Sequence, residues 1–417
     1  MNSIRPYYLL LRNNHNFRRL WLSQIISNFG DWFGILAVYT LILRYSESEF
    51  LLGLVIVIKF LSFAFSSPLG GYIADRFDRR TLLILCDFAR GFIVLGFLLV
   101  VSADLLWLVY VLTALQMTFS AVFEPAKQAS IPNITKGEEL MLANVISTMS
   151  WSVIFTTGMG IGGVATAYLG TDAVFIINAV SYIGSTWFMF KATIPHVRDK
   201  QLIASMSNPF KGIRDGFVYL LTTGPILRPA LAKGTISFVL GGLVYMLILV
   251  SEEVLLMGTV GLGILYAGRG LGTAVGPVLV RRFIKDESKW VTTMGVAMIL
   301  SGLCYLVVGQ TDALWLMVIF VILAHCGSGA NWVMSTVMLQ KRSPDTLRGR
   351  VFSSEWLFFT VTQSISVLIA SLILDYNLLT LRELMFIFSM LLMITGMIWL
   401  FTISRRELNW QKARDTA

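Results

Sequence analysis

Charged residues are scarce in this chain of 417 residues. Asp, Glu, Lys and Arg make up 14% of it, whereas roughly 25% is usual in a soluble protein. Hydrophobic residues make up 56%, and because a membrane-spanning helix needs about 20 apolar residues, this is enough for about twelve spans. The shortage of charge therefore excludes a water-soluble fold and predicts an all-α polytopic membrane protein.

Cysteine and histidine are also few. The three cysteines, Cys86, Cys304 and Cys326, each lie inside an apolar run, so we expect neither a disulfide framework nor a metal site. The three histidines are scattered and no nucleophile motif lies beside them, which disfavours an integral-membrane enzyme that would need a clustered catalytic set. No Gly-Lys-Ser/Thr loop is present, so an ATP-driven pump is excluded within this chain, and no cofactor is expected.

Apolar windows separated by charged residues, glycine and proline predict twelve membrane-spanning helices. They lie near residues 18–43, 51–72, 81–101, 105–126, 144–168, 173–191, 230–250, 258–280, 291–309, 313–338, 353–373 and 383–403. The longest polar interval, from Lys191 to Pro229, follows the sixth span. It predicts two six-helix bundles, at 1–192 and 229–417, joined by a cytoplasmic linker at 193–228. The first 16 residues hold no apolar run that ends in a cleavage site, so no cleaved signal peptide is expected.

Basic residues are distributed unequally between the two sides of the predicted membrane. Of the 33 Lys and Arg residues, 27 lie at the termini and in every second loop, whereas the opposite loops hold only Arg44 and Arg382. Cytoplasmic loops carry such an excess, so we expect a bacterial inner-membrane protein with both termini in the cytoplasm. The net charge of +9 is then explained by topology and by anionic lipid headgroups, without nucleic acid as a partner.

A short cytoplasmic turn after the second span carries an unusual set of residues. Its sequence is Gly71-Tyr-Ile-Ala-Asp75-Arg76-Phe-Asp78-Arg79-Arg80. Positive-inside anchoring explains the arginines, but Gly71 and Asp75 need another reason. A glycine lets the backbone turn tightly beside a neighbour, and an aspartate accepts from a helix N-terminus or pairs with arginine.

This turn resembles the signature loop between helices 2 and 3 of the major facilitator superfamily, G-x-x-x-D-R-x-G-R-R, with Asp78 in place of the second glycine. A degenerate second copy follows the eighth span, at Gly276-Pro-Val-Leu-Val-Arg-Arg282. Parallel-related halves of a transporter predict such a half-repeat. Segments such as Phe123-Glu-Pro-Ala126 and Asn178-Ala-Val-Ser181 resemble one branch, the macrolide-efflux and enterobactin-exporter group.

The resemblance implies a secondary active transporter whose two bundles rock around a central cavity, giving alternating access. It also implies export of small amphipathic molecules by proton antiport, and a gating role for the turn residues Gly71, Asp75, Arg76, Arg79 and Arg80. The expected partners are the transported molecule, protons and the lipid bilayer, for a chain that acts as a monomer. Antiporters of the superfamily usually carry G-P-x-x-G-G in helix 5, and here Met159 replaces the proline in Gly158–Gly163.

Ionisable residues inside the predicted spans are the candidate site residues. A charge at the bilayer centre costs about 2.5–3.5 kcal/mol, so it usually faces a partner or an aqueous cavity. Asp87 and Arg90 are three residues apart and share a helix face, which predicts an intrahelical ion pair. Asp31 then has no partner at helical spacing. It is either a proton or substrate site, or a structural partner of Lys59 or Arg269.

The sum of the deep charges bears on the transported molecule. Asp31, Lys59 and Arg269 contribute one negative and two positive charges. This sum favours anionic or zwitterionic amphiphiles over cationic ones. A lipid or lysophospholipid flippase on the same fold is the alternative, and it would need no proton gradient.

Four further residues, Glu124, Glu355, His325 and Asn331, are secondary candidates. Lys233, Glu124 and Glu355 lie near the cytoplasmic ends of their spans, where we expect them to reach lipid headgroups or to pack. His325 and Asn331 lie among glycines in the tenth span. A lone histidine on an apolar helix is more often a packing residue than a proton relay.

Overall fold

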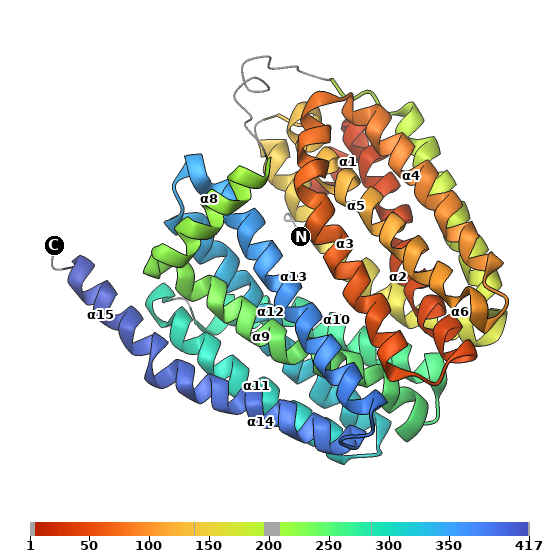
Figure 1. The fold of residues 1–417 in the computed structure, drawn as a ribbon. Helices are drawn as coiled ribbons and strands as arrows, with labels where there is room; N and C mark the ends of the chain where they lie inside the picture. Colours follow the sequence, from red (N-terminus) through yellow and green to blue (C-terminus); the bar gives the residue numbers. More distant parts are fainter. Residues whose placement is uncertain (1–4, 137, 196–208, 285, 416–417) are drawn as a thin grey trace. The chain divides into compact units, whose positions relative to one another are not determined.

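The computed structural model describes residues 5–136, 138–195, 209–284 and 286–415. Within these ranges the regular secondary structure is helical and contains no strand (Figure 1). The helices are α1 (Arg5–Asn13), α2 (His15–Tyr45), α3 (Glu49–Arg76), α4 (Arg79–Gly96), α5 (Leu106–Ile134), α6 (Glu138–Lys191), α8 (Pro209–Thr222), α9 (Gly224–Leu249), α10 (Gly258–Phe283), α11 (Trp290–Gln310), α12 (Leu314–Arg342), α13 (Asp345–Asp375), α14 (Leu381–Phe401) and α15 (Ile403–Asp415). Short helical turns are η1 (Phe97–Leu99), η2 (Ala103–Leu105), η3 (Val250–Val254) and η4 (Glu287–Lys289).

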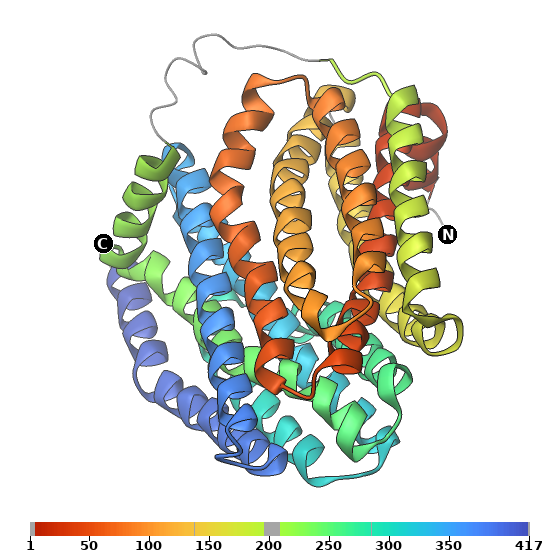
Figure 2. The same cartoon turned by 45° about the vertical axis from the view of Figure 1, so that its right-hand side comes forward.

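Eleven helical stretches among the described residues are long and apolar enough to cross a membrane. One of them, α6, consists of two helices that meet at Gly170, where φ is 80° and ψ is 167°. Glycine adopts this backbone conformation without the steric cost of a Cβ atom. Figure 2 shows the chain turning back within α6, from yellow to yellow-green. The described chain therefore contains twelve spanning segments, and the predicted all-α polytopic fold is confirmed.

The chain divides into two compact units by its internal contacts. Unit 1 comprises residues 1–47 and 58–209, and unit 2 comprises residues 48–57 and 210–417. In unit 1, α2 packs against α6, and α4 packs against α5 and α6. In unit 2, α9 packs against α13, α10 against α12, and α11 against α12 and α14. The first turns of α3 thus belong to unit 2, and the rest of that helix belongs to unit 1.

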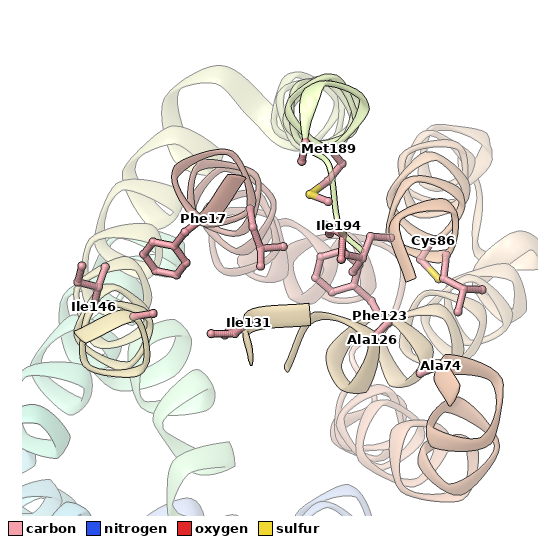
Figure 3. Packing of buried hydrophobic residues seen from close by; sticks show 14 of the residues in the cluster. Phe17, Ala74, Cys86, Phe123, Ala126, Ile131, Ile146, Met189 and Ile194 are labelled. Atoms are coloured by element: carbon pink, nitrogen blue, oxygen red, sulfur yellow. The ribbon is translucent and has the colours of Figure 1, made fainter. Parts of the chain in front are cut away.

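Buried apolar side chains join the start of α2 to the ends of α5 and α6 in unit 1 (Figure 3). Phe17 of α2 and Phe123 of α5 are each 1% exposed, and Met189 of α6 is fully buried. In membrane helices such side chains stabilise the fold through close van der Waals packing between helices. The cluster fixes the helix ends that flank the charged residues of unit 1.

A buried carboxylate joins the C-terminal helix α15 to the rest of unit 2. Glu407 of α15 is 1% exposed. It pairs with Arg228 of α9 and with Arg342 of α12, each at 2.5 Å. Because two guanidinium groups bind one carboxylate, α15 is held against the ends of both helices.

Glycines allow several helices to approach backbone to backbone. A Cβ atom added at Gly70 of α3 would lie 2.0 Å from the Ala121 carbonyl oxygen of α5, and one added at Gly162 of α6 would lie 2.5 Å from the Phe33 carbonyl oxygen of α2. Small residues serve this purpose in membrane helix packing. We expected Gly71 to be the glycine at a tight turn, but it lies inside α3 and an added Cβ atom there meets nothing within 4 Å. The glycine that lies close to the backbone of α5 is Gly70, one residue earlier.

Adjacent glycines therefore provide a matched test of this packing. Gly70→Ala is expected to destabilise the protein by about 1–3 kcal/mol, because the methyl group has no space against α5. Gly71→Ala is expected to be neutral or slightly stabilising, since alanine is the better helix former. Thermal unfolding of the purified protein in detergent measures both variants, and equal melting temperatures for the two would contradict the packing described here.

Candidate functional site

A buried charged cluster in unit 1 is centred on Arg90 of α4. Its guanidinium contacts the Asp87 carboxylate on the same helix, and its Nη1 lies 3.4 Å from Oδ2 of Asp31 on α2. The Arg90 side chain is 3% exposed and that of Asp87 is 0% exposed, whereas that of Asp31 is 25% exposed. Two carboxylates therefore share one guanidinium, and Asp31 is the more accessible of the two.

Uncharged donors complete the environment of both carboxylates. The Tyr182 hydroxyl of α6 donates a hydrogen bond to Oδ1 of Asp31. The Gln116 side-chain amide of α5 donates to the same oxygen at 3.2 Å and to the Tyr182 oxygen at 3.1 Å. Ser185 of α6 donates to Asp87. The cluster thus joins α2, α4, α5 and α6 through polar contacts inside the membrane-spanning part of unit 1.

Aromatic rings and a hydroxyl hold the Arg90 guanidinium in place. Its central carbon lies 4.5 Å from the centre of the Phe123 ring and 4.7 Å from that of the Tyr182 ring. Nη1 also lies 3.3 Å from the Ser120 hydroxyl, which is buried on α5. Cation–π contacts of this kind strengthen when water is excluded. The position of the positive charge is therefore fixed, while the side chain of Asp31 remains partly open.

The structure adds a basic partner of Asp31 that the sequence interpretation did not name. We expected a structural Asp31 to pair with Lys59 or Arg269, and the structure shows an ion pair with Arg90. Nζ of Lys59 lies 5.1 Å from the centre of the Trp32 ring, which neighbours Asp31 in the sequence. Helical spacing identifies neighbours on one helix, whereas Arg90 lies 59 positions away along the chain.

The residues of the turn have different roles at the two helices that it joins. Asp78 caps the start of α4, because its side chain accepts a hydrogen bond from the Thr81 backbone N–H at 2.8 Å. This accounts for an aspartate at the position where the family signature has glycine. Arg76 lies 4.1 Å from the centre of the Tyr72 ring. The backbone of Asp75 belongs to α3, and its side chain lies outside the described part of the structure.

The remaining arginines of the turn bind carbonyl groups near the ends of other helices. Nη1 of Arg79 donates to the Ala129 carbonyl of α5 at 2.7 Å. Nε of Arg80 donates to the Met189 carbonyl of α6 at 3.3 Å. Cations near helix C-termini interact favourably with the negative end of the helix dipole. Within unit 1, this turn therefore ties the start of α4 to the ends of α5 and α6.

Unit 2 holds a second buried ion pair. Lys233 of α9 pairs with Glu355 of α13, and their side chains are 3% and 2% exposed. Nζ of Lys233 also donates to the Thr336 hydroxyl at 3.1 Å and lies 4.0 Å from the centre of the Trp332 ring. Of the two expected alternatives, headgroup contact and packing, the structure shows packing for both residues, because both are buried inside the unit. Glu124 of unit 1 pairs with a lysine one turn away, Lys127, at 2.7 Å.

The two polar residues of the tenth span have different surroundings. His325 is 3% exposed, with Nε2 2.9 Å from the Tyr305 hydroxyl and Nδ1 3.1 Å from the Ser328 hydroxyl. Both ring nitrogens are thus satisfied, as in a packing residue. Asn331 is 0% exposed, and among the described residues neither its amide nitrogen nor its oxygen has a hydrogen-bond partner.

Sequence reasoning missed the uncharged members of the Arg90 cluster, Gln116, Tyr182 and Ser185. Placing an uncharged polar residue inside a span costs less free energy than placing a charge there. Such residues are therefore common in membrane helices, and their presence does not by itself indicate a functional site. The one available signal is the run Asn178-Ala-Val-Ser181, which lies next to Tyr182. The described residues contain no group of three or more His, Cys, Asp or Glu side chains that could hold a metal ion.

Among the described residues, twelve apolar helical segments with charges buried among them define a multi-pass membrane protein. Residues 20–366 match the sequence model of the Major Facilitator Superfamily. The match spans well over half of the chain, so this chain belongs to the Major Facilitator Superfamily, which is a family of transporters and not of enzymes.

Individual relatives agree with this assignment. The uncharacterized MFS-type transporter YfiS of Bacillus subtilis is 29% identical over 55% of each chain. The enterobactin exporter EntS of Shigella boydii is 25% identical over 82% of this chain and 81% of its own. The fold is similar to that of a bacterial homologue of the lysosomal transporter Spinster, with a TM-score of 0.74, 15% identity and 98% of both chains covered. The POT family transporter PepTSo also gives a TM-score of 0.74, at 13% identity over 95% of this chain and 99% of its own.

Removing the positive charge of Arg90 tests how much the cluster contributes to the stability of the protein. Arg90→Gln leaves Asp31 and Asp87 without their guanidinium and is expected to destabilise the protein by about 3–5 kcal/mol. Adding Asp31→Asn and Asp87→Asn to that variant is expected to restore most of the loss, because no lone charge then stays buried. The measurement is the melting temperature and the monodisperse fraction in detergent.

A variant of an exposed ion pair serves as the control. Lys341 and Glu287 form an exposed pair in unit 2, with side chains 58% and 50% exposed. Lys341→Gln is expected to change stability by less than about 1 kcal/mol, since exposed pairs contribute little. Equal stability of Arg90→Gln and Lys341→Gln would show that the Arg90 cluster contributes no more to stability than an exposed ion pair does.

Proposed function

We propose that this chain is a secondary active transporter that exports small amphipathic molecules in exchange for protons, by alternating access. The observation that carries the proposal is the sharing of one guanidinium by two carboxylates. With both acids ionised, Arg90 compensates one of them and one negative charge remains. The cluster can therefore accept one proton and become neutral.

Asp31 is the carboxylate that takes this proton. Its side chain is 25% exposed, whereas that of Asp87 is fully buried against Arg90 and Ser185. A proton reaches an accessible carboxylate more readily than one enclosed by protein. Asp87 and Arg90 then remain as a neutral pair while Asp31 alternates between its charged and uncharged forms.

Protonation of Asp31 changes the contacts between helices. The ionised carboxylate attracts Arg90 of α4 and accepts hydrogen bonds from Gln116 of α5 and Tyr182 of α6. An uncharged carboxyl group loses the attraction to Arg90. Because a proton shifts an equilibrium only through different interactions in the two states, this loss is the means by which protonation favours one arrangement of α2 over another.

The comparisons support the direction of transport and the membrane. EntS, which resembles most of this chain, is named as an exporter. Uptake of a proton down its gradient provides the free energy for export from a bacterial cell. The excess of basic residues at the termini and in alternate loops supports an inner-membrane location with both termini in the cytoplasm. The deep positive charges favour anionic or zwitterionic amphiphiles as cargo.

The turn between α3 and α4 is proposed to control the rocking of the helices. Arg79 and Arg80 hold the ends of α5 and α6, and Asp78 fixes the start of α4. Changes at Asp78 or at these arginines would therefore be transmitted to three helices at once. The turn regulates the rate of transport in this proposal, and the proton binds elsewhere.

Asp31→Asn tests proton coupling because it keeps the shape of the side chain and removes the change of charge. In proteoliposomes screened with anionic, zwitterionic and cationic amphiphiles, the variant is expected to lose accumulation driven by a pH gradient. Binding and downhill exchange of the same amphiphile are expected to remain. The exposed loop acid Asp312, which is 71% exposed, supplies the control variant Asp312→Asn with unchanged transport.

Two outcomes would overturn the role of Asp31. Gradient-driven accumulation at the wild-type rate in Asp31→Asn would remove it from the coupling mechanism. Loss of folded protein in Asp31→Asn, although Asp87 still balances Arg90 in that variant, would show that the residue serves only as a structural ion-pair partner.

Single-cysteine labelling tests the proposed orientation. In a variant lacking Cys86, Cys304 and Cys326, a cysteine at Glu47 is expected to react with a membrane-impermeant maleimide added outside intact cells. A cysteine at Lys136, which is exposed just after α5, is expected to react only after the membrane is permeabilised. The reverse pattern would place the termini outside the cytoplasm.

A further inference from the structure

Unit 2 contains a group of aromatic rings around the buried lysine Lys233. Nζ of Lys233 lies 4.0 Å from the centre of the Trp332 ring. The Trp332 ring packs edge to face against Trp356 and Phe359, with ring centres 5.6 Å and 5.0 Å apart. The three rings are only partly buried, whereas Lys233 is 2% exposed. We call these four residues the Lys233 aromatic cluster.

The lysine and its carboxylate partner are difficult to explain as a stabilising feature. Burying Lys233 and Glu355 together removes both charges from water, and a buried ion pair seldom adds stability over apolar residues of the same size. Charges retained inside membrane helices usually serve a function. The retained pair therefore makes Lys233 a candidate ligand-binding group, and a ligand acid group would share its Nζ with Glu355.

A second observation at the same place is the unpaired amide of Asn331. Its nitrogen and oxygen have no hydrogen-bond partner among the described residues. Asn331 precedes Trp332 and lies one turn before Ser335, whose hydroxyl donates to the Pro229 carbonyl of α9 at 2.7 Å. Residues four positions apart share a helix face, so Asn331 is on the α9-facing side of α12. An unpaired buried amide costs about 1–3 kcal/mol, and a polar ligand group would supply the missing partner.

Unit 1 repeats the combination of a lysine, a tryptophan and two further rings. Nζ of Lys59 lies 5.1 Å from the centre of the Trp32 ring. The Trp32 ring packs edge to face against Phe155 and Trp151, with centres 4.6 Å and 6.0 Å apart. The two partner rings come from one helix in each unit, α6 here and α13 in unit 2. In unit 1 the lysine is only partly buried, so the fully buried lysine with a carboxylate partner distinguishes the group in unit 2.

We propose that the Lys233 aromatic cluster is a binding site for an aromatic molecule that carries a single negative charge, such as an aryl carboxylate. The acid group lies against Nζ of Lys233, and the ring packs on Trp332 and Phe359. Cationic molecules are disfavoured because Lys233 already occupies the position over the Trp332 ring. The inference rests on the proposed export function in one respect, namely that the bound molecule is the transported one.

Binding of 2-naphthoate to the purified full-length protein tests the site directly. Equilibrium dialysis is performed with 2-naphthoate, with its saturated counterpart decahydro-2-naphthoate, and with 2-naphthylmethylammonium. The wild-type protein is expected to bind 2-naphthoate about tenfold more tightly than either of the others, because only it offers both the ring and the negative charge. Equal binding of the three probes, or no binding of 2-naphthoate, overturns the proposal.

Variants of the ring and of the charge separate the two contributions. Trp332→Leu keeps the ion pair and is expected to weaken 2-naphthoate binding about tenfold without affecting the saturated acid. The matched control is Trp315→Leu on the same helix, since Trp315 is 65% exposed. The double variant Lys233→Gln with Glu355→Gln removes the pair without leaving a lone buried charge and is expected to weaken binding of both acids about tenfold. The double variant Lys341→Gln with Glu287→Gln removes an exposed pair instead and should bind as the wild type does.

The outcomes distinguish this inference from the proposed transport mechanism. Asp31→Asn is expected to bind 2-naphthoate as the wild type does while losing gradient-driven accumulation. Wild-type affinity in both Trp332→Leu and the Lys233 and Glu355 double variant overturns the binding site and leaves proton coupling at Asp31 intact. Weakened binding in those variants, together with unchanged gradient-driven transport in Asp31→Asn, supports the site and rejects the coupling mechanism.

Discussion

A guanidinium buried among membrane helices has to be balanced where it lies, and Arg90 is balanced by carboxylates on two helices. Asp87 on α4 provides a fully buried partner, and Asp31 on α2 provides a partly accessible one. The hydrogen bonds from Gln116 and Tyr182 follow from this arrangement, since each needs an acceptor inside the span. The packing of unit 1 around α2 therefore depends on a charge balance that a single proton can change.

The two units balance their buried charges differently. In unit 1, two acids compete for one base, and a net negative charge remains available for titration. In unit 2, Lys233 and Glu355 form a balanced pair surrounded by aromatic rings. The first arrangement suits proton exchange, and the second suits recognition of a ligand. We infer that unit 1 couples transport to the proton and that unit 2 contributes to recognition of the transported molecule.

The sequence allowed the fold to be predicted well because membrane spans are long apolar runs bounded by charge, glycine and proline. The twelve segments and the family could be recognised in this way, whereas the partners of individual charges could not. Spacing along one helix places Asp87 beside Arg90, but the contact of Arg90 with Asp31 depends on how α2 packs against α4, which no local pattern encodes. For the same reason the sequence left headgroup contact and packing open for Lys233 and Glu355, since the two residues meet only after α9 packs against α13.

Infrared difference spectroscopy on the reconstituted protein tests the exchangeable proton at Asp31 most directly. Spectra recorded at low and high pH report carboxyl groups that gain a proton, through the C=O stretch of the protonated form. The account predicts a band that is present in the wild type, absent in Asp31→Asn and retained in Asp87→Asn. A band that persists in Asp31→Asn and disappears in Asp87→Asn would contradict it, because the buried acid and not the accessible one would then carry the proton.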